Sequence, residues 1–245
     1  MHRFYCQHAD FTQKTIAITD GHEIHHIKNV LRLKAGDELA VFNGLNQEAR
    51  VMIVGIKQGE IQARVDALRE AAATEGPKII LACAVPKKAK FELIIEKCTE
   101  LGVDAIIPLS TARTEVVFSK EKIPAKRERF QKIAVNAAKQ CGRPNVPEIY
   151  PMTSLGEALR MRGPDTAALI PSLNGTPEYI REVLTSLKKA GTVMVFIGPE
   201  GDFTPDEMRL AVEHGCVPVS LGNTVLKVDT AAITTVALCR FFLYN

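Results

Sequence analysis

The pattern of hydrophobic and polar residues changes near residue 70. Before this point, apolar and polar residues alternate over short stretches, which is typical of half-buried β-strands. Beyond it, short unbroken apolar runs alternate with longer stretches that carry an apolar residue every three or four positions, as in buried parallel strands and amphipathic helices. The pattern predicts a small β-rich domain over residues 1–70, a linker over 71–77, and an α/β domain with a parallel sheet over 78–245.

The first region is predicted to form a small β-barrel, because hairpins that surround one small core commonly close in this way. Turn residues at Asn43-Gly44 and Gln58-Gly59 separate the strands. One short helix, Glu23–Leu33, is expected among them. The predicted strands are Lys14–Thr19, Glu38–Phe42, Glu48–Val54 and Ile61–Ala67.

The second region alternates strands with helices, which is the order of a parallel sheet covered by helices. The predicted strands are Ile79–Val85, Ala105–Leu109, Ala167–Pro171 and Val193–Ile197, and the predicted helices are Lys87–Leu101, Lys126–Cys141, Pro177–Lys189 and Thr230–Tyr244. The last helix is apolar on nearly all sides, and one sheet can cover only part of its circumference. We therefore expect it to be buried partly against a second copy of the chain, in a homodimer.

Two glycine-containing loops follow buried strands of the second region. Gly198-Pro199-Glu200-Gly201 follows one strand, and the strand after the next helix ends at Gly222. Glycine tolerates positive φ and has no side chain, so the backbone of both loops is open to close approach by a ligand. Thr204-Pro205-Asp206-Glu207 has the residues of a capping box and begins the helix between the loops. Parallel strands place such loops at the carboxyl edge of the sheet, where open α/β sheets bind ligands.

Charge and cysteine content narrow the class of protein. The net charge is +3, but residues 71–150 hold 14 Lys and Arg against 9 Asp and Glu. A solvated helix face explains most such excesses, and a polyanionic partner is the alternative. The six cysteines include no C-x-x-C pair, which argues against a zinc knuckle or a disulfide framework. There is no apolar run of membrane-spanning length and no secretory signal, so we expect a cytoplasmic protein with reduced thiols that does not bind membranes.

One short motif could hold a metal. His22-Glu23-Ile24-His25-His26 matches H-E-x-x-H, which on a helix places two His over a zinc ion with Glu as general base. A zinc protease also needs a third ligand and a long supporting helix. Here Asp20-Gly21 directly precedes the motif, and the predicted helix ends within about three turns. We therefore prefer exposed His residues on a short helix, with a place near an RNA phosphate as the second alternative, and expect no metal site.

The two glycine loops and the residues beyond them resemble a family signature. The chain reads Ile-Gly-Pro-Glu-Gly at 197–201, Ser-Leu-Gly at 220–222 and Leu-Lys-Val-Asp-Thr-Ala at 226–231. This order is similar to the S-adenosylmethionine site of the SPOUT methyltransferases, in the ribosomal RNA small subunit methyltransferase E family, which methylates N3 of a uridine in bacterial 16S ribosomal RNA. Further similar stretches are Arg3-Phe4-Tyr5, His26–Arg32, Glu100-Leu101-Gly102-Val103, Ala112-Arg113-Thr114 and Ala137–Arg143.

The resemblance implies an α/β fold of the SPOUT type with a carboxyl-terminal trefoil knot, and a PUA-like RNA-binding β-barrel at the amino terminus. It implies an S-adenosylmethionine-dependent ribosomal RNA (uridine-N3) methyltransferase and homodimer. Its substrate would be 16S ribosomal RNA, either free or within the small ribosomal subunit. The implied cofactor-binding residues are Leu173, Gly198, Glu200, Gly201, Leu221, Gly222, Leu226 and Thr230, and the implied RNA-binding residues are Arg3, Arg32, Arg113 and Arg143.

Three positions depart from the usual sequence of the family. Lys227 and Asp229 stand where the family usually has Arg and Glu; these changes keep the charges, but they remove the planar guanidinium and shorten the acid by one methylene. We nevertheless take Asp229 and Lys227 as the candidate catalytic residues, with water as the alternative acceptor of the N3 proton. Asp202 replaces a usual Gly, and Asp can still occupy a left-handed backbone conformation.

Two other classes of function stay open at this stage. A non-catalytic RNA-binding protein of the ribosome-assembly type would need the barrel and the basic middle region, but no S-adenosylmethionine. A zinc hydrolase would need a metal at His22 and His26. Calorimetry with S-adenosylmethionine and metal analysis together separate all three classes.

Overall fold

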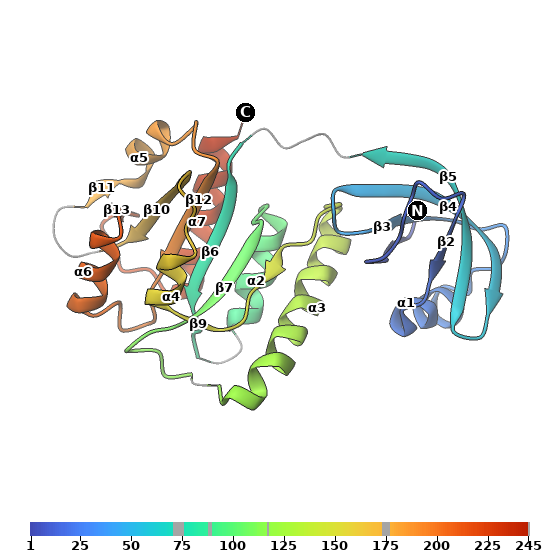
Figure 1. Ribbon diagram of the computed structural model, residues 1–245, viewed down its shortest axis with the longest axis horizontal. Coiled ribbons are helices and arrows are strands. Elements are labelled where there is room, and N and C mark those ends of the chain that lie inside the picture. The colour runs from blue at the N-terminus through green and yellow to red at the C-terminus, as the bar shows by residue number, and fades with distance from the viewer. Residues whose placement is uncertain (71–75, 88–89, 117, 173–176, 245) are drawn as a thin grey trace. The chain divides into compact units, whose positions relative to one another are not determined.

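The computed structural model describes residues 1–70, 76–87, 90–116, 118–172 and 177–244 (Figure 1). The chain forms two compact units. The amino-terminal unit consists of Met1–Ala73 together with Ala138–Val146, and the carboxyl-terminal unit consists of Thr74–Ala137 together with Pro147–Asn245. The segment Ala138–Val146 therefore belongs to the unit that precedes it in the chain, which the hydrophobic pattern did not predict.

The amino-terminal unit is built on one curled, five-stranded sheet with the strand order β1-β3-β4-β5-β2 (Figure 1). β1 pairs with β3 in parallel, and the other pairs are antiparallel. Register shifts within the β4–β5 pair increase the local twist. The thiol of Cys6, directly after β1, donates to the carbonyl of Ala17 in β2 at 3.5 Å, so the two edge strands approach each other. The strands are β1 (Arg3–Tyr5), β2 (Thr15–Ile18), β3 (Glu38–Phe42), β4 (Gln47–Lys57) and β5 (Glu60–Glu70).

The predicted helix of this unit has two parts. Helix α1 (Gly21–His25) begins at Asp20, whose carboxylate accepts hydrogen bonds from the backbone N–H groups of His22 and Glu23. The chain then continues as a π-helix, η1 (His26–Val30), a form that an apolar pattern does not distinguish from an α-helix. Ile24 and Ile27 point into the core of the unit, which also contains Phe4, Ile18, Leu39, Ile53 and Ile61.

The carboxyl-terminal unit contains the predicted parallel sheet. Its strand order is β11-β13-β10-β12-β6-β7-β8, with β9 also pairing with β7, and every strand pair that the structure describes in this sheet is parallel. The strands are β6 (Lys78–Ala84), β7 (Ala105–Ser110), β8 (Glu148–Ile149), β9 (Thr153–Ser154), β10 (Thr166–Pro171), β11 (Glu178–Tyr179), β12 (Thr192–Ile197) and β13 (Cys216–Ser220).

Helices cover both faces of this sheet. Successive side chains of a strand point to opposite faces, and Met194 and Phe196 of β12 pack in one cluster with residues of α4 and α6. Helix α7 packs against β6, β12, α2 and α5 on the other face, toward which Val193 and Val195 point. The helices are α2 (Lys90–Glu100), α3 (Ile123–Cys141), α4 (Leu155–Arg160), α5 (Ile180–Ser186), α6 (Pro205–Glu213) and α7 (Val228–Leu243).

One predicted helix is shorter than expected. The helix predicted over Pro177–Lys189 is observed only as α5, because Glu178–Tyr179 form β11 and pair with the end of β13. Pairing with a neighbouring strand overrides the helical pattern here. Helix α7, in contrast, lies within two residues of its prediction at each end.

Candidate functional site

A pocket lies at the carboxyl edge of the parallel sheet. The loops after β10, β12 and β13 line it, and these strands are neighbours in the order β13-β10-β12. The pocket holds about 640 Å³ of empty space, part of which is open to solvent. Its lining residues are Pro171, Ser172, Ile197, Gly198, Pro199, Glu200, Asp202, Leu221, Gly222, Thr224, Val225, Leu226, Val228 and Ala231.

The loop after β12 is a tight turn. The Asp202 N–H donates to the Pro199 carbonyl at 2.9 Å, and the Asp202 carboxylate accepts the Phe203 N–H at 2.8 Å. Asp202 adopts a φ of +62°, which confirms that Asp can take the left-handed conformation at this position. The Thr204–Glu207 capping box then begins α6, as predicted.

The glycines of this loop serve a different purpose from the one expected. Neither Gly198 nor Gly201 has a positive φ. They are needed because neighbouring side chains approach closely. A Cβ at Gly198 would lie 3.1 Å from the Phe203 ring, and a Cβ at Gly201 would lie 3.3 Å from Cδ of Arg113.

The loop after β13 does depend on the conformational freedom of glycine. Gly222 has a φ of +121°, and its N–H donates to Oγ of Ser220 at 3.2 Å. A Cβ at this position would have no heavy atom within 4 Å, so Gly222 borders open space. The loop therefore presents bare backbone to the pocket.

The first turn of α7 completes the pocket. Val228 and Ala231 line it, and the first helical hydrogen bond runs from the Ala231 N–H to the Lys227 carbonyl at 2.8 Å. No side chain caps this helix start. The N–H groups of its first turn therefore lack helical partners, and the helix dipole favours negative charge beside them.

The two candidate catalytic residues lie at this helix start but do not pair with each other. Asp229 is bound by Lys90 of α2, with 3.2 Å between Nζ and the carboxylate. Lys227 is exposed, and its ammonium group makes no hydrogen bond or ion pair with the part of the chain that the structure describes. Neither residue lines the pocket itself.

Most of the predicted cofactor residues come together around the pocket. Five of them line it: Gly198, Glu200, Leu221, Gly222 and Leu226. Gly201 and Thr230 do not line the pocket, but each is next in the chain to a residue that does. Leu173 lies outside the described residues. The sequence did not predict Pro171 and Ser172. They directly precede Leu173, the one residue of this loop that the family resemblance implied, and the position of β10 between β12 and β13 brings the loop to the pocket.

Loops from two further strands brace the loop after β12. The Arg113 guanidinium donates to the Gly201 carbonyl at 2.6 Å, and the Lys87 N–H donates to the Glu200 carboxylate at 3.2 Å. Lys87 also forms an ion pair with Glu115 at 2.6 Å, which joins the loops after β6 and β7. Arg113, a candidate RNA-binding residue, thus lies beside the loop after β12.

Thiol chemistry does not contribute to this site. Burial holds the pKa of Cys83 well above its usual value, and the nearby carboxylates of Glu200 and Asp229 add to this shift. Burial also raises the pKa of Cys98 and of Cys239 to about 12. These thiols are therefore protonated at neutral pH and are poor nucleophiles.

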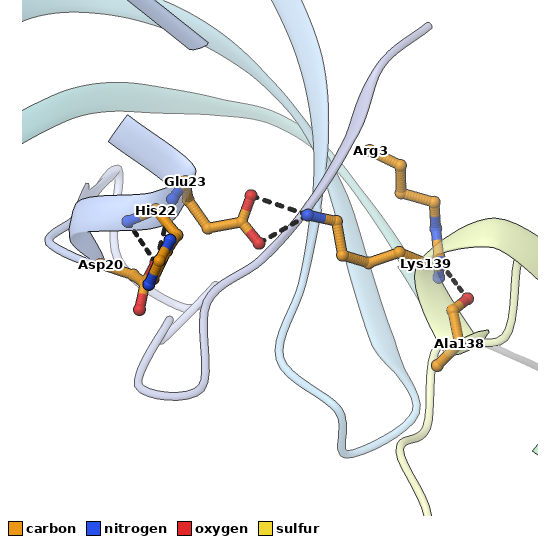
Figure 2. A network of polar contacts seen from close by, with 6 residues as sticks. All are labelled: Arg3, Asp20, His22, Glu23, Ala138 and Lys139. Atoms are coloured by element: carbon orange, nitrogen blue, oxygen red, sulfur yellow. Dashed lines mark hydrogen bonds and ion pairs between the residues drawn. The ribbon is translucent and has the colours of Figure 1, made fainter. Parts of the chain in front are cut away.

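The other candidate RNA-binding residues lie in the amino-terminal unit. Arg3 is largely buried, and its guanidinium donates to the Ala138 carbonyl at 2.8 Å (Figure 2). It also donates to Glu48 at 2.6 Å and to the Arg143 carbonyl at 2.7 Å. This geometry favours a structural role for Arg3 over the predicted contact with RNA. Arg32 is exposed, has a φ of +56°, and makes no hydrogen bond or ion pair among the described residues.

Glu23 of the H-E-x-x-H motif also has a structural partner. Both of its carboxylate oxygens accept hydrogen bonds from Lys139, at 2.6 and 2.8 Å (Figure 2). This pairing occupies the carboxylate that a zinc protease would use as its general base. Among the described residues, no group of three His, Cys, Asp or Glu is placed to hold a metal ion.

Comparisons with known proteins agree with the geometry of both units. A model of the RNA methyltransferase domain matches residues 74–240, and a model of the RNA methyltransferase PUA domain matches residues 18–66. The chain is 32% identical to the ribosomal RNA small subunit methyltransferase E of Bacillus subtilis (strain 168) over 223 residues, which cover 89% of this chain and 87% of that protein. The chain belongs to the ribosomal RNA small subunit methyltransferase E family.

One more relative and two solved structures are also similar to this chain over most of its length. The Synechocystis protein of this name is 33% identical over 229 residues, covering 93% of this chain and 73% of that protein. The Neisseria gonorrhoeae member, solved bound to S-adenosyl methionine, superposes with a TM-score of 0.86 at 25% identity over 98% of this chain and 97% of that chain. A Legionella pneumophila protein, solved in complex with the same cofactor, gives a TM-score of 0.86 at 31% identity, covering 98% of this chain and 96% of that chain.

The structure adds one negative finding about membranes. Within the described ranges, no helix combines the length and the apolar character that crossing a bilayer requires.

Proposed function

We propose that this protein transfers the methyl group of S-adenosylmethionine to N3 of one uridine in 16S ribosomal RNA. The observation that carries the proposal is the pocket formed by the loops after three neighbouring parallel strands. Membership of the family supports it, as do the two similar structures that were solved with S-adenosylmethionine.

The pocket fits this cofactor. Backbone groups of the loops that contain Gly198 and Gly222 would hold the polar edges of the cofactor, and Leu221, Leu226 and Val228 would offer it apolar contacts. The open space in front of Gly222 is the space that a ligand would fill. Pro171, Ser172, Glu200 and Ala231 complete the set of residues that we assign to the cofactor.

The chemistry needs little from the protein beyond alignment. S-adenosylmethionine, when bound, supplies a methyl group that the sulfonium already activates. The protein has to hold the uridine in line with this methyl group, exclude competing water and let the N3 proton leave. No covalent residue is needed, in agreement with the inert thiols near the pocket.

The ion pair of Asp229 with Lys90, at the start of α7, helps to decide whether Asp229 or water accepts the N3 proton. Asp229 is held by Lys90, so taking up a proton would neutralise the carboxylate and weaken this contact between α2 and α7. We therefore assign proton removal to water at the mouth of the pocket and give Asp229 the task of fixing the start of α7. Lys227, which is exposed beside the pocket, is then available to attract the RNA phosphate.

Several finer features belong to the same proposal. We propose that the carboxyl-terminal unit contains a trefoil knot and that the curled sheet of the amino-terminal unit closes as a PUA-like RNA-binding barrel. The placement of β12 between β10 and β6 supports the first, and the contact between Cys6 and Ala17 supports the second. We further propose a cytoplasmic location and ribosomal RNA, free or in the small subunit, as the partner.

The exposed end of α7 supports a homodimer. Phe241, near the end of α7, is 80% exposed. An exposed aromatic ring on an apolar helix suits an isologous interface, in which each copy covers the same surface of the other. The proposed dimer would bury this surface.

Two measurements test the proposed function. Calorimetry should show that the purified protein binds S-adenosylmethionine. Transfer of labelled methyl groups should then be measured to free 16S ribosomal RNA and to small subunits that lack the modification, with digestion and mass spectrometry to identify the product. N3-methyluridine is expected in at least one of the two substrates. A protein that binds RNA but has no affinity for the cofactor would instead be a non-catalytic RNA-binding protein.

A further inference from the structure

We propose that Glu23 and Arg3 are positioning residues that hold the segment Ala138–Val146 in the amino-terminal unit and thereby complete the RNA-binding surface of that unit. The inference rests on the proposed function only in naming RNA as the ligand. It gives a role to the Glu of the H-E-x-x-H motif, which the cofactor pocket does not use.

The first anchor is the ion pair between Glu23 and Lys139. Both oxygens of Glu23 accept hydrogen bonds from one ammonium group, and the two side chains are only 10% and 18% exposed. The backbone of Glu23 is fixed in turn, because the Asp20 carboxylate accepts its N–H at 2.9 Å (Figure 2). Lys139 also lies over the ring of the buried Phe4, at 5.6 Å. The last turn of α3 is therefore tied to α1 and β1.

The second anchor runs in the opposite direction, from the sheet to the segment. Arg3 of β1 donates to the carbonyls of Ala138 and Arg143 while Glu48 and the ring of Phe42 hold its guanidinium in place. The last carbonyls of a helix have no helical partner, and a cation near a helix C-terminus is favourable. Arg3 thus caps the end of α3 from another element.

A third set of contacts holds the far end of the segment. The Val146 N–H donates to the Gly44 carbonyl at 3.1 Å, and Asn145 forms backbone bridges with Gly44 and Leu45. The side chain of Asn145 accepts the Nε–H of Arg143 at 3.0 Å. The segment is therefore fixed at both ends. Arg143, between these ends, is held through its carbonyl by Arg3 and through its Nε–H by Asn145.

The chemistry of these anchors suits positioning better than stability. A buried ion pair adds little stability compared with apolar residues of the same size, but it permits one arrangement in which all of its hydrogen bonds are made. None of the residues that line the cofactor pocket belongs to Ala138–Val146 or contributes to these anchors. Loss of an anchor should therefore weaken RNA binding and leave cofactor binding unchanged.

A charge-reversal series tests this inference in the full-length protein. Glu23→Lys makes the protein more positive, which by itself would strengthen binding to a polyanion. We expect it instead to weaken binding of a 16S ribosomal RNA fragment about tenfold or more, because two ammonium groups would then face each other. Glu38→Lys is the matched control: Glu38 is exposed in the same unit, and the same charge change there should leave RNA binding equal or stronger. The double variant Glu23→Lys with Lys139→Glu should restore most of the affinity.

Hydrogen exchange provides a readout that does not need RNA. In Glu23→Gln and Arg3→Met, the amides of residues 139–146 should exchange faster, while affinity for S-adenosylmethionine stays within about twofold of the wild type. Two results together would overturn the inference. They are equal RNA affinity of Glu23→Lys and Glu38→Lys, and unchanged hydrogen exchange of residues 139–146 in Glu23→Gln. If the wild type binds no RNA at all, the proposed function fails, and the exchange experiment still decides whether the anchors hold the segment.

Discussion

Gly222 is the residue at which backbone conformation and the pocket are most directly linked. Its φ of +121° is a conformation that L side chains rarely adopt, and a side chain there would enter open space at the pocket. We expect Gly222→Val to abolish cofactor binding in calorimetry and to lower the free energy of unfolding by about 1–3 kcal/mol. The protein should remain folded by circular dichroism. Wild-type affinity for the cofactor in this variant would remove the loop after β13 from the site.

The ion pair of Asp229 allows the assignment of the N3 proton to be tested. If water accepts the proton and Asp229 only fixes the start of α7, Asp229→Asn should lower the methylation rate without changing the shape of its pH profile. Lys90→Met should have a similar effect, because either change removes the same contact. Rates should be measured under single-turnover conditions with saturating substrates. Asp229 would be the proton acceptor if the methylation rate lost its dependence on pH in Asp229→Asn but kept it in Lys90→Met.

At the residue scale, the sequence predicted which loops line the pocket better than it predicted the partners of individual charged residues. Glycine and proline signal a turn by themselves, and both loops proved to line the pocket. Charge alone did not reveal that the guanidinium of Arg3 is used within its own unit, since an isolated Arg in a sequence carries no information about its partners. The same limit applies to Glu23, whose partner is 116 residues away.

Helices α2 and α7 each contain a buried thiol that links stability to pH. The pKa of Cys98 and of Cys239 is raised by burial from an ordinary value of 9.0 to about 12. Between these values the unfolded chain loses protons that the native protein retains, so stability falls as the pH rises from about 9 toward about 12 and is unaffected below this range. Each thiol contributes about 1.4 kcal/mol per pH unit at most.

Urea denaturation between pH 8 and pH 11 measures this effect. Cys98→Ala should reduce the slope of stability against pH by up to about 1.4 kcal/mol per pH unit. Cys141→Ala, which removes an exposed thiol, is the matched control. Equal slopes in the wild type and in Cys98→Ala would show that this thiol does not titrate in the range.

The proposed interface on α7 can be tested at its exposed end. Phe242 is half-buried and packs edge-on against Phe241 at 5.6 Å, so the exposed Phe241 is the better target. Burial of such a ring stabilises a contact by about 1.5–3 kcal/mol, and Phe241→Asp would place a charge in it. Sedimentation should show monomers for this variant and dimers for the wild type at micromolar concentration. A fully active wild-type monomer would contradict the proposed dimer.

At the scale of elements, prediction succeeded best for β3 and for the long buried strands of the parallel sheet. β3 and the start of α6 agree with the sequence, and β6, β7, β10 and β12 lie within one residue at each end. Strands of two or three residues, such as β1, β8 and β11, are too short to show a period. The pairing of β11 with β13 is a tertiary contact that local sequence does not contain.

At the scale of the whole molecule, the periodicities identified the two classes of architecture but not how the chain is shared between the units. The linker region separates two patterns, and both sheets were found where expected. The assignment of Ala138–Val146 to the first unit depends on hydrogen bonds and ion pairs that only the folded chain brings together. Within a continuous helical pattern, nothing marks the point at which α3 passes from one unit to the other.

The central claim is that this protein methylates N3 of one uridine in 16S ribosomal RNA, and mass spectrometric mapping of that RNA tests it most directly. RNA should be taken from cells that lack the protein and from the same cells supplied with the wild type or with Gly222→Val. We predict that one N3-methyluridine is absent without the protein, returns with the wild type and does not return with the variant. An unchanged modification pattern, or the loss of a different modification, would contradict the account.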